Sequence, residues 1–276
     1  MSVMGEKSAE IIKVEDLGSA GVVLKALAPH GREELPRPGQ FAMLRPAGAS
    51  LQVFLGRPIS YLDATARANG EAELSFYLKV VGEGTRALAE LSPGDRLDYL
   101  GPFGAGFPVP ATTGWLVGGG VGIAPIHHLV AECARAGIEP ERFRIFYGGR
   151  RASDLPFLEG LTAHSGELTT TTEDGSAGVH GRVTDALEPA LEALTPDQGD
   201  GVQVYTCGPT PMMAAVAALA SRFDVGCLAS LETRMACGYG VCLGCVVHLE
   251  GEGYVRTCVE GPVLDAHRLN FGERWL

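Results

Sequence analysis

Short apolar runs separated by turn residues dominate the first 110 residues of the chain. The strand-like runs are residues 22–24, 41–44 and 73–81. Turn dipeptides such as Pro38-Gly39, Asn69-Gly70 and Pro93-Gly94 lie between them. Helical periodicity is confined to residues 85–91. Because short strands at this spacing close readily into a barrel, the pattern predicts a small antiparallel β-barrel over residues 1–110.

Strand and helix patterns alternate after Pro108-Val109-Pro110. The expected strands are residues 115–117, 143–147, 167–172 and 202–205, and the expected helices are residues 125–136, 184–194 and 211–222. Gly137 is expected to end the first helix, and Thr210 to cap the last, with Pro211 at its first position. The alternation predicts an α/β domain with a parallel sheet over residues 111–228. The expected fold is therefore α+β and multidomain, with a small cysteine-rich module at residues 229–276.

Composition and charge exclude two classes of partner. The 276 residues include 22 Lys and Arg against 33 Asp and Glu, and the formal net charge of −11 repels nucleic-acid phosphates. The most apolar stretch, residues 115–130, is interrupted by glycines, a proline and two histidines, unlike a membrane span. The first ten residues contain no apolar signal region, so we expect a cytoplasmic protein.

Four of the seven cysteines follow the spacing C-x4-C-x2-C-x12-C. This spacing is typical of plant-type [2Fe–2S] sites, where a tight loop supplies three thiolates and a separate segment the fourth. Glycines at 238, 240 and 244 keep the loop small, so that its N–H groups can turn toward the sulfurs. Zinc is the main alternative, but its sites usually pair cysteines as two C-x2-C knuckles. The expected cluster ligands are Cys237, Cys242, Cys245 and Cys258.

Two further cysteines, Cys133 and Cys227, lie outside this spacing and are expected to be small buried hydrophobes.

Two turns each follow a predicted strand and precede a predicted helix, which is where open parallel sheets bind ligands. The first, residues 118–125, reads GGGVGIAP, and the second is Cys207-Gly208-Pro209. Glycines let the backbone approach a pyrophosphate at a helix N-terminus, although a tight structural turn is the alternative. A proline stands where G-x-G-x-x-G has its third glycine. The candidate nucleotide-binding residues are Gly119, Gly120, Gly122, Pro125, Cys207, Gly208 and Pro209.

The barrel segment contains two further candidate binding motifs. In Arg57-Pro58-Ile59-Ser60, the arginine fork can hold a diphosphate and the serine hydroxyl can donate to a flavin ring nitrogen. In Gly82-Glu83-Gly84-Thr85, backbone N–H groups and the threonine hydroxyl can bind phosphate; an ordinary capped turn is the alternative.

Taken in order, RPIS, GEGT, GGGVGIAP and CGPTPM resemble the ferredoxin reductase superfamily of flavin and nicotinamide modules. The tail LETRMACGYGVCLGC, with a later cysteine, resembles the electron-transfer subunits of NAD-linked, heteromeric dihydroorotate dehydrogenases. The resemblance extends from about residue 39 to residue 258, and the segment TEDGS at 172–176 with Gly178 and Gly181 is also similar.

This resemblance implies FAD in the barrel, NAD(H) on the α/β domain and a [2Fe–2S] cluster on the C-terminal loop. It assigns FAD contacts to residues 57–60, to Gly84 and Thr85, and to a third segment, Tyr77-Leu78-Lys79, whose last position is often arginine in the family. It implies no acid–base catalyst in this chain, and we expect His127 and His128 to pack rather than to catalyse.

The resemblance also implies a partner and a direction of electron flow. An FMN-containing catalytic subunit would oxidise dihydroorotate in pyrimidine biosynthesis, and electrons would pass through the cluster and FAD to NAD+. The implied complex is a heterotetramer with two copies of each subunit.

Other functions remain open from the sequence. The main alternative is the small subunit of an NAD(P)H–ferredoxin transhydrogenase or of a hydrogenase-type diaphorase. In the similar transhydrogenase subunit an aspartate replaces the first cluster cysteine, which is Cys237 here. A metal-stabilised binding module without catalysis is a further alternative. The choice between NAD and NADP also stays open, because Arg150 and Arg151 could hold a 2′-phosphate.

Overall fold

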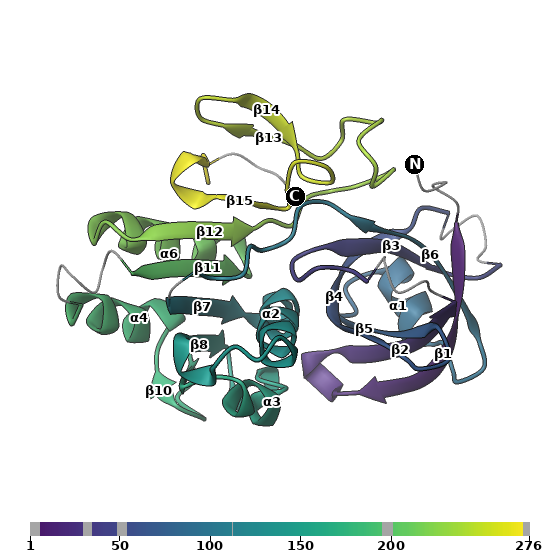
Figure 1. Ribbon diagram of the computed structural model, residues 1–276, viewed down its shortest axis with the longest axis horizontal. Helices are drawn as coiled ribbons and strands as arrows, with labels where there is room; N and C mark the ends of the chain where they lie inside the picture. Colours follow the sequence, from purple (N-terminus) through teal and green to yellow (C-terminus); the bar gives the residue numbers. More distant parts are fainter. Residues whose placement is uncertain (1–5, 30–34, 49–53, 112, 195–200, 273–276) are drawn as a thin grey trace.

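The computed structural model describes residues 6–29, 35–48, 54–111, 113–194 and 201–272. Figure 1 shows three parts: a barrel formed by the N-terminal segment, a sheet flanked by helices, and a C-terminal module in yellow-green that lies above both. No helix in the described part of the chain is long and apolar enough to cross a membrane.

The N-terminal part is a closed barrel whose strands follow the order β1-β2-β5-β4-β3-β6, and each neighbouring pair is antiparallel. Its strands are β1 (Lys7–Asp16), β2 (Val22–Pro29), β3 (Phe41–Pro46), β4 (Arg57–Ala66), β5 (Glu71–Leu78) and β6 (Arg96–Phe103). Alternate side chains such as Leu24, Tyr61 and Phe76 fill the interior. The predicted barrel is confirmed. The strand expected at 73–81 ends at Leu78, and the short helix α1 (Glu83–Ala89) follows it.

The central sheet has the order β10-β9-β8-β7-β11-β12-β15 and is parallel except for β15. Its strands are β7 (Thr113–Gly119), β8 (Phe143–Gly149), β9 (Glu167–Thr172), β10 (Val179–His180), β11 (Val202–Cys207), β12 (Gly226–Ser230) and β15 (Val263–Asp265). The predicted α/β architecture is confirmed. The antiparallel strand β15 comes from the C-terminal segment, which thereby extends the sheet.

Helices cover both faces of this sheet, so its strands bury side chains on both sides. They are α2 (Ile123–Arg135), α3 (Leu158–Ala163), α4 (Val183–Glu192) and α6 (Thr210–Arg222). Along β7, Trp115 and Val117 pack with α4 and α6, whereas Leu116 packs with α2. Cys227 and Cys133 are buried in these two cores, as expected.

The expected cap of the last helix is wrong by one residue. Helix α6 already includes Thr210, its N-cap is Pro209, and no side chain caps its first turn. Pro211 consequently occupies the second helical position, where its missing N–H costs no intrahelical hydrogen bond.

The strand order places the two predicted nucleotide turns side by side. Helix α2 follows β7 and leads to β8 on one side, whereas β11 pairs with β7 on the other, so the order reverses at β7. Gly118 of β7 pairs with Cys207 of β11; β11 ends there and β7 ends one residue later. Ligands of open parallel sheets bind at such a reversal, beyond the carboxyl ends of the strands.

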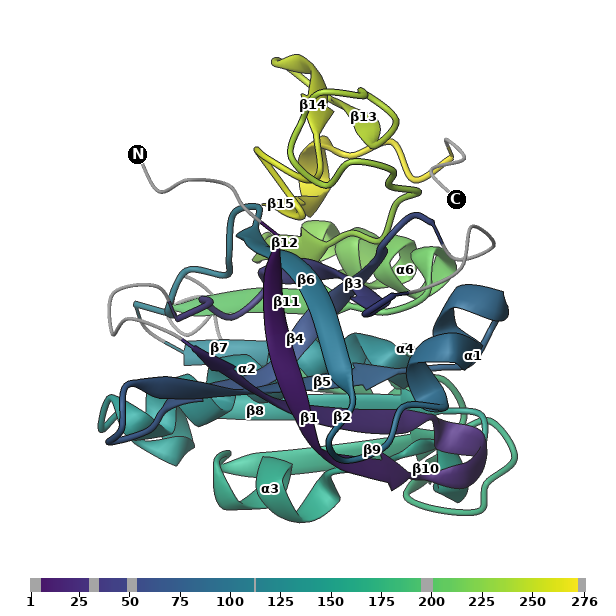
Figure 2. The same ribbon diagram turned by 90° about the vertical axis from the view of Figure 1, so that its right-hand side faces the viewer.

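The C-terminal module contains the hairpin of β13 (Val246–Leu249) and β14 (Gly253–Arg256), which lies at the top of Figure 2. Val247, Leu249 and Val255 of the hairpin are buried in the apolar core that also contains side chains of β12, β15 and α6. The cysteine loop packs on the barrel. Cys245 and Cys258 form one buried cluster with Phe41 and Met43 of β3. The loop is thereby fixed to the strand that pairs with β4.

Candidate functional site

A cavity of about 730 Å³ opens where the barrel, the central sheet and the C-terminal segment meet. Its volume is within the range of about 300–1,000 Å³ that is usual for ligand and cofactor sites. Most of the predicted cofactor residues line it: Pro58, Ile59, Ser60, Tyr77, Leu78, Lys79, Thr85, Gly119, Gly120, Gly122, Pro125, Cys207, Gly208 and Pro209. One cavity therefore joins motifs that are as far as 150 residues apart in the sequence.

Arg57 and Gly84 are not among the cavity-lining residues, but they lie against each other. A Cβ atom on Gly84 would overlap the Arg57 guanidinium, so only glycine allows this contact. The Nη1 atom of Arg57 donates to the Leu55 carbonyl at 2.6 Å. A guanidinium carries five N–H donors, so this fixed side chain keeps donors for a diphosphate beside the cavity. The residues on the barrel side thus fit the phosphates of FAD.

The Thr85 hydroxyl forms hydrogen bonds within its own turn, to residues 81 and 82. It accepts from the N–H groups of Val81 and Gly82 at 2.9 and 3.1 Å and donates to the Gly82 carbonyl at 3.0 Å. These bonds support the capped-turn alternative for the hydroxyl, although Thr85 also lines the cavity.

Tyr77 joins the barrel to the α/β domain. Its hydroxyl donates to the Ala20 carbonyl at 2.7 Å, and its ring meets Phe157 edge-on with 5.0 Å between centroids. Burial raises the pKa of Tyr77 to about 12, so the phenol stays neutral. Lys79, two residues beyond, is exposed at the edge of the cavity.

The two nucleotide turns are packed against each other with no spare room. A Cβ atom on Gly122 would lie 2.3 Å from the Cys207 carbonyl oxygen and 2.5 Å from the Gly208 nitrogen. Gly122 is therefore required by close backbone approach. Burial raises the pKa of the Cys207 thiol to about 12, so Cys207 presents a neutral thiol to the cavity.

The residues before the first cluster cysteine also line the cavity, and the sequence reasoning missed them. They are Ser230, Leu231, Glu232, Thr233 and Met235. Glu232 lines the cavity and is exposed to it. Protein atoms around its carboxyl still bury that group in part, which raises its pKa. The only available signal was their position directly before the cysteine loop.

Arg150, Glu173 and Arg182 line the part of the cavity beside the nucleotide turns. Arg151 instead lies 3.8 Å from the Asp154 carboxylate.

The four predicted cluster cysteines come together as two pairs. The Sγ atoms of Cys245 and Cys258 are 3.2 Å apart. Cys237 and Cys242 form the other pair, in which the Cys242 N–H points at the Cys237 sulfur at 3.5 Å. Within the described residues, no three His, Cys, Asp or Glu side chains converge as they would around a single ion. Two thiol pairs fit two irons better than they fit one tetrahedral zinc.

Backbone geometry prepares one of these pairs for metal binding. Burial opposes ionisation of Cys237, but N–H groups of the loop lower the pKa of its thiol to about 6. The Gly244 N–H points at the Cys242 sulfur at 3.5 Å, as the glycine content of the loop predicts. In the buried pair, burial and the Cys245 thiol raise the pKa of Cys258 to about 12, and a bound cation would stabilise both thiolates.

The cysteine loop and the cavity share a wall. Phe41 and Met235 line the cavity, and both also pack in the cluster of side chains that contains Cys245 and Cys258. A group held by these thiols would therefore be separated from a cavity ligand by the side chains of Phe41 and Met235.

Neither His127 nor His128 is among the described residues that line the cavity. His128 is completely buried, and burial lowers its pKa to about 4. Both histidines lie in packed surroundings on α2, in agreement with the expected packing role.

Family models match two parts of the chain. Residues 232–270 match the iron–sulfur cluster binding domain of dihydroorotate dehydrogenase B. Residues 116–218 match an oxidoreductase NAD-binding domain. These segments contain the four cluster cysteines and both nucleotide turns, respectively.

Curated relatives cover nearly the whole chain. The dihydroorotate dehydrogenase B (NAD+) electron transfer subunit of Caldanaerobacter subterraneus subsp. tengcongensis is 37% identical over 241 residues, 86% of this chain and 88% of that protein. The subunit of the same name from Clostridium acetobutylicum is 36% identical over 260 residues, 94% of this chain and 93% of that protein.

Solved structures share the fold. An NADH-dependent reduced ferredoxin-NADP oxidoreductase, described for flavin-based electron bifurcation, aligns with a TM-score of 0.79 and 27% identity over 99% of this chain and 92% of its own. A ferredoxin NADP+ reductase from Neisseria gonorrhoeae, with bound FAD and NADP, aligns with a TM-score of 0.61 and 18% identity over 79% of this chain and 91% of its own. The second likeness concerns the fold alone.

Proposed function

The chain belongs to the family of electron transfer subunits of NAD-linked dihydroorotate dehydrogenase B, and from this premise we propose that it passes electrons from a dihydroorotate-oxidising partner through a [2Fe–2S] cluster and FAD to NAD+. It is an oxidoreductase subunit, and the reaction places it in pyrimidine biosynthesis. The observation that carries the proposal is the wall of Phe41 and Met235, which packs with the Cys245–Cys258 pair and lines the cavity. The transhydrogenase and diaphorase alternatives are not favoured, because curated relatives at 36–37% identity carry the dihydroorotate dehydrogenase name.

FAD, when bound, exchanges a hydride with NAD(H) and single electrons with the cluster. The role of this chain is to bind and orient. Arg57 would hold the FAD diphosphate, and residues 58–60 and 77–79 would line the flavin side of the cavity. The turns containing Gly122 and Gly208 would receive the NAD pyrophosphate, because their backbones meet at the start of α2.

Cys237 with Cys242, and Cys245 with Cys258, would each hold one iron of the cluster. The assignment rests on the two pairs and on the N–H groups directed at the first pair. Those N–H groups stabilise negative charge on the sulfurs and so influence the reduction potential.

The partner would dock over the cysteine loop. Three large apolar side chains of this loop are exposed: Tyr239 at 42%, Val241 at 73% and Leu243 at 58% of their surface. Exposed apolar side chains grouped in this way are typical of interaction sites. From the family resemblance we further propose that the partner contains FMN, that the complex holds two copies of each subunit, and that it is cytoplasmic.

Partner dependence tests the proposal. The purified chain, loaded with FAD and cluster, is expected to reduce artificial dyes with NADH but to show no dihydroorotate-dependent reduction of NAD+. Oxidation of dihydroorotate needs a base beside the reacting C–H bond and a flavin ring that faces dihydroorotate. In this cavity the flavin ring would face nicotinamide instead. Adding an FMN-containing, dihydroorotate-oxidising partner should restore turnover, which is followed by NADH absorbance. Substantial dihydroorotate turnover by the chain alone would refute the proposal.

The FAD assignment gives a second test. Arg57→Ala is expected to weaken FAD binding by about tenfold to a hundredfold, because a charge-assisted hydrogen bond contributes about 1.5–3 kcal/mol. Binding is measured by the quenching of flavin fluorescence on titration of the apoprotein. Arg67→Ala is the matched control: Arg67 pairs with Glu73 at 2.7 Å at the end of the same strand, and its loss should leave FAD affinity unchanged. Unchanged affinity in Arg57→Ala would remove Arg57 from the site.

A further inference from the structure

The barrel and the α/β domain are joined by directional bonds as well as by apolar packing. The apolar cluster between them contains Val23, Leu62 and Tyr77 of the barrel together with Ile126 and Leu129 of α2. Apolar contact is non-directional, so it holds the two parts together without fixing their relative angle. Directional hydrogen bonds and an ion pair between β4 and α2 can fix that relative angle.

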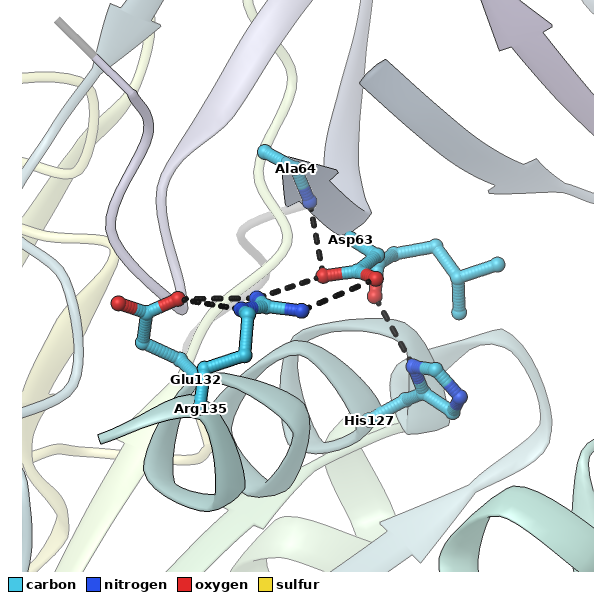
Figure 3. Close-up of polar contacts among 6 residues, drawn as sticks. Asp63, Ala64, His127, Glu132 and Arg135 are labelled. Carbon is cyan, nitrogen blue, oxygen red and sulfur yellow. Dashed lines mark hydrogen bonds and ion pairs between the residues drawn. The ribbon is translucent and has the colours of Figure 1, made fainter. Parts of the chain in front are cut away.

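The first of these bonds is a two-point ion pair. The Arg135 guanidinium, at the end of α2, donates to both carboxylate oxygens of Asp63 in β4, at 2.8 and 3.3 Å (Figure 3). Glu132, one turn earlier on α2, accepts from the same guanidinium at 2.9 and 3.1 Å. Burial opposes ionisation of Asp63, but the Arg135 guanidinium holds the pKa of its carboxyl below the usual value. A planar fork that binds a carboxylate at two points restricts rotation as well as distance.

The second bond lies two helical turns earlier. His127 and the Leu62 carbonyl are linked by a hydrogen bond of 3.1 Å between Nδ1 and the oxygen (Figure 3). The His127 ring also meets Phe157, whose ring in turn meets Tyr77 of the barrel. Phe157 adopts a φ of 68°, a left-handed conformation that is costly for a residue other than glycine. We call Leu62, Asp63, His127 and Arg135 the interdomain clamp.

A β-bulge aims both barrel residues of the interdomain clamp at α2. Between β4 and β5, Tyr61 pairs with Phe76 and Asp63 pairs with Ser75, so Leu62 is an extra residue without a partner. Tyr61 and Ala64 consequently both point into the barrel core, and the two residues between them face outward. The extra residue frees the Leu62 carbonyl for His127. Bulges of this kind redirect side chains next to functional sites.

The same two elements carry the cofactor motifs at their other ends. Strand β4 begins with Arg57 to Ser60, and α2 begins directly after the turn that contains Gly122. About 12 residues separate the start of α2 from Arg135, a length of roughly 18 Å at 1.5 Å per residue. A rotation of α2 by about 5° about Arg135 would thus move the nucleotide turn at its other end by roughly 1.6 Å. Hydride transfer needs the reacting atoms about 3–3.5 Å apart, and 1 Å of misplacement can cost about a hundredfold in rate.

We propose that the interdomain clamp consists of positioning residues that fix the nicotinamide site against the flavin site. This inference rests on the proposed function, since it presupposes hydride transfer between NAD(H) and FAD. None of the four clamp residues is among the residues that line the cavity; the clamp would act through β4 and α2, whose opposite ends do line it.

Arg135→Ala and Asp63→Ala, made in the full chain loaded with FAD and cluster, test the clamp. Each is expected to slow the reduction of bound flavin by NADH about tenfold in stopped-flow absorbance, with FAD content and NADH affinity unchanged. The double variant should be no slower than either single variant, because the two residues act as one unit. Arg135→Lys keeps the charge but not the two-point geometry, so it should recover part of the rate.

The matched control is Arg222→Ala. Arg222 pairs with Glu188 between α6 and α4, within the α/β domain, and so forms an ion pair that does not join the two domains. Its loss should leave flavin reduction unchanged. An Arg135→Ala variant that transfers hydride at the parent rate, or an equal loss of rate in Arg222→Ala, would overturn the proposal.

A second readout needs no cofactor. In the full chain without added nucleotide, Arg135→Ala should increase hydrogen–deuterium exchange at residues 62–64 and in the last turn of α2, while Tm falls by no more than about 4 °C. Unchanged exchange there would also overturn the clamp. If NADH does not reduce flavin even in the parent chain, the proposed function fails, and the exchange comparison still decides whether the clamp holds the domains.

Discussion

Replacing Cys242 with serine is expected to abolish iron binding and to lower the rate of partner-linked electron transfer by more than about a hundredfold. Changing a residue that only hydrogen-bonds to a metal ligand costs about tenfold to a hundredfold, and loss of a ligand should cost more. Cys242 forms one of the two thiol pairs, and without it Cys237 has no neighbour to share an iron. Cys242 is exposed, so its replacement removes no core packing and the chain should fold normally. The reduction of dyes by NADH should persist, because the nucleotide turns lie in a different part of the chain.

Iron content, visible absorbance and NADH-dependent dye reduction measure this outcome together. Cys133→Ala is the matched control, since Cys133 lies on the buried face of α2, outside the cysteine loop. It should keep its full iron content. A Cys242→Ser chain with unchanged iron and absorbance would show that the thiol pairs are not the cluster ligands.

Gly122→Ala is expected to weaken NADH binding at least about tenfold and to lower the free energy of unfolding by about 1–3 kcal/mol. The added Cβ would lie 2.3 Å from the Cys207 carbonyl oxygen. Because the obstructing atoms belong to the backbone, no side-chain rotation can relieve the overlap, and the two turns must separate. The N–H groups that face the pyrophosphate would move with them. Fluorescence titration with NADH and thermal unfolding measure the two effects.

Gly137→Ala separates the clash from the general cost of losing a glycine. Gly137 lies just after the other end of α2, with a φ of +74° and open space around its Cβ position. Its replacement should cost about 1 kcal/mol of backbone strain and leave NADH affinity unchanged. Parent-like NADH affinity in Gly122→Ala would show that the packed turns do not form the nucleotide site.

Most features that depend on neighbouring residues alone were predicted correctly from the sequence; the N-cap of α6 is an exception. Strand β9 has the expected bounds, and the turn that begins at Gly118 lies between a strand and a helix as expected. The cysteine spacing predicted a compact loop with N–H groups directed at sulfur, and two such contacts are present. Local patterns succeed because a turn or a loop of few residues is determined by the conformational freedom of those residues.

The sequence-based prediction failed where the partner of a segment is distant in the chain. Strand β15 joins the sheet by pairing with β12, about 35 residues earlier, and its three residues carry no distinctive periodicity. Glu232 and Met235 enter the cavity wall for the same reason. The bulge at Leu62 is also invisible in the sequence, since it depends on the register between β4 and β5.

The sequence by itself determined the order of barrel, α/β domain and cysteine module, because hydrophobic periodicity and glycine spacing are properties of neighbouring residues. Tertiary structure alone decided how these parts work together. It sorted four thiols into two pairs, packed Phe41 against the Cys245–Cys258 pair at the cavity wall, and joined β4 to α2 through Asp63 and Arg135. The physical reason is that such contacts join residues far apart in the chain, and their geometry depends on strand pairing and packing across the whole fold.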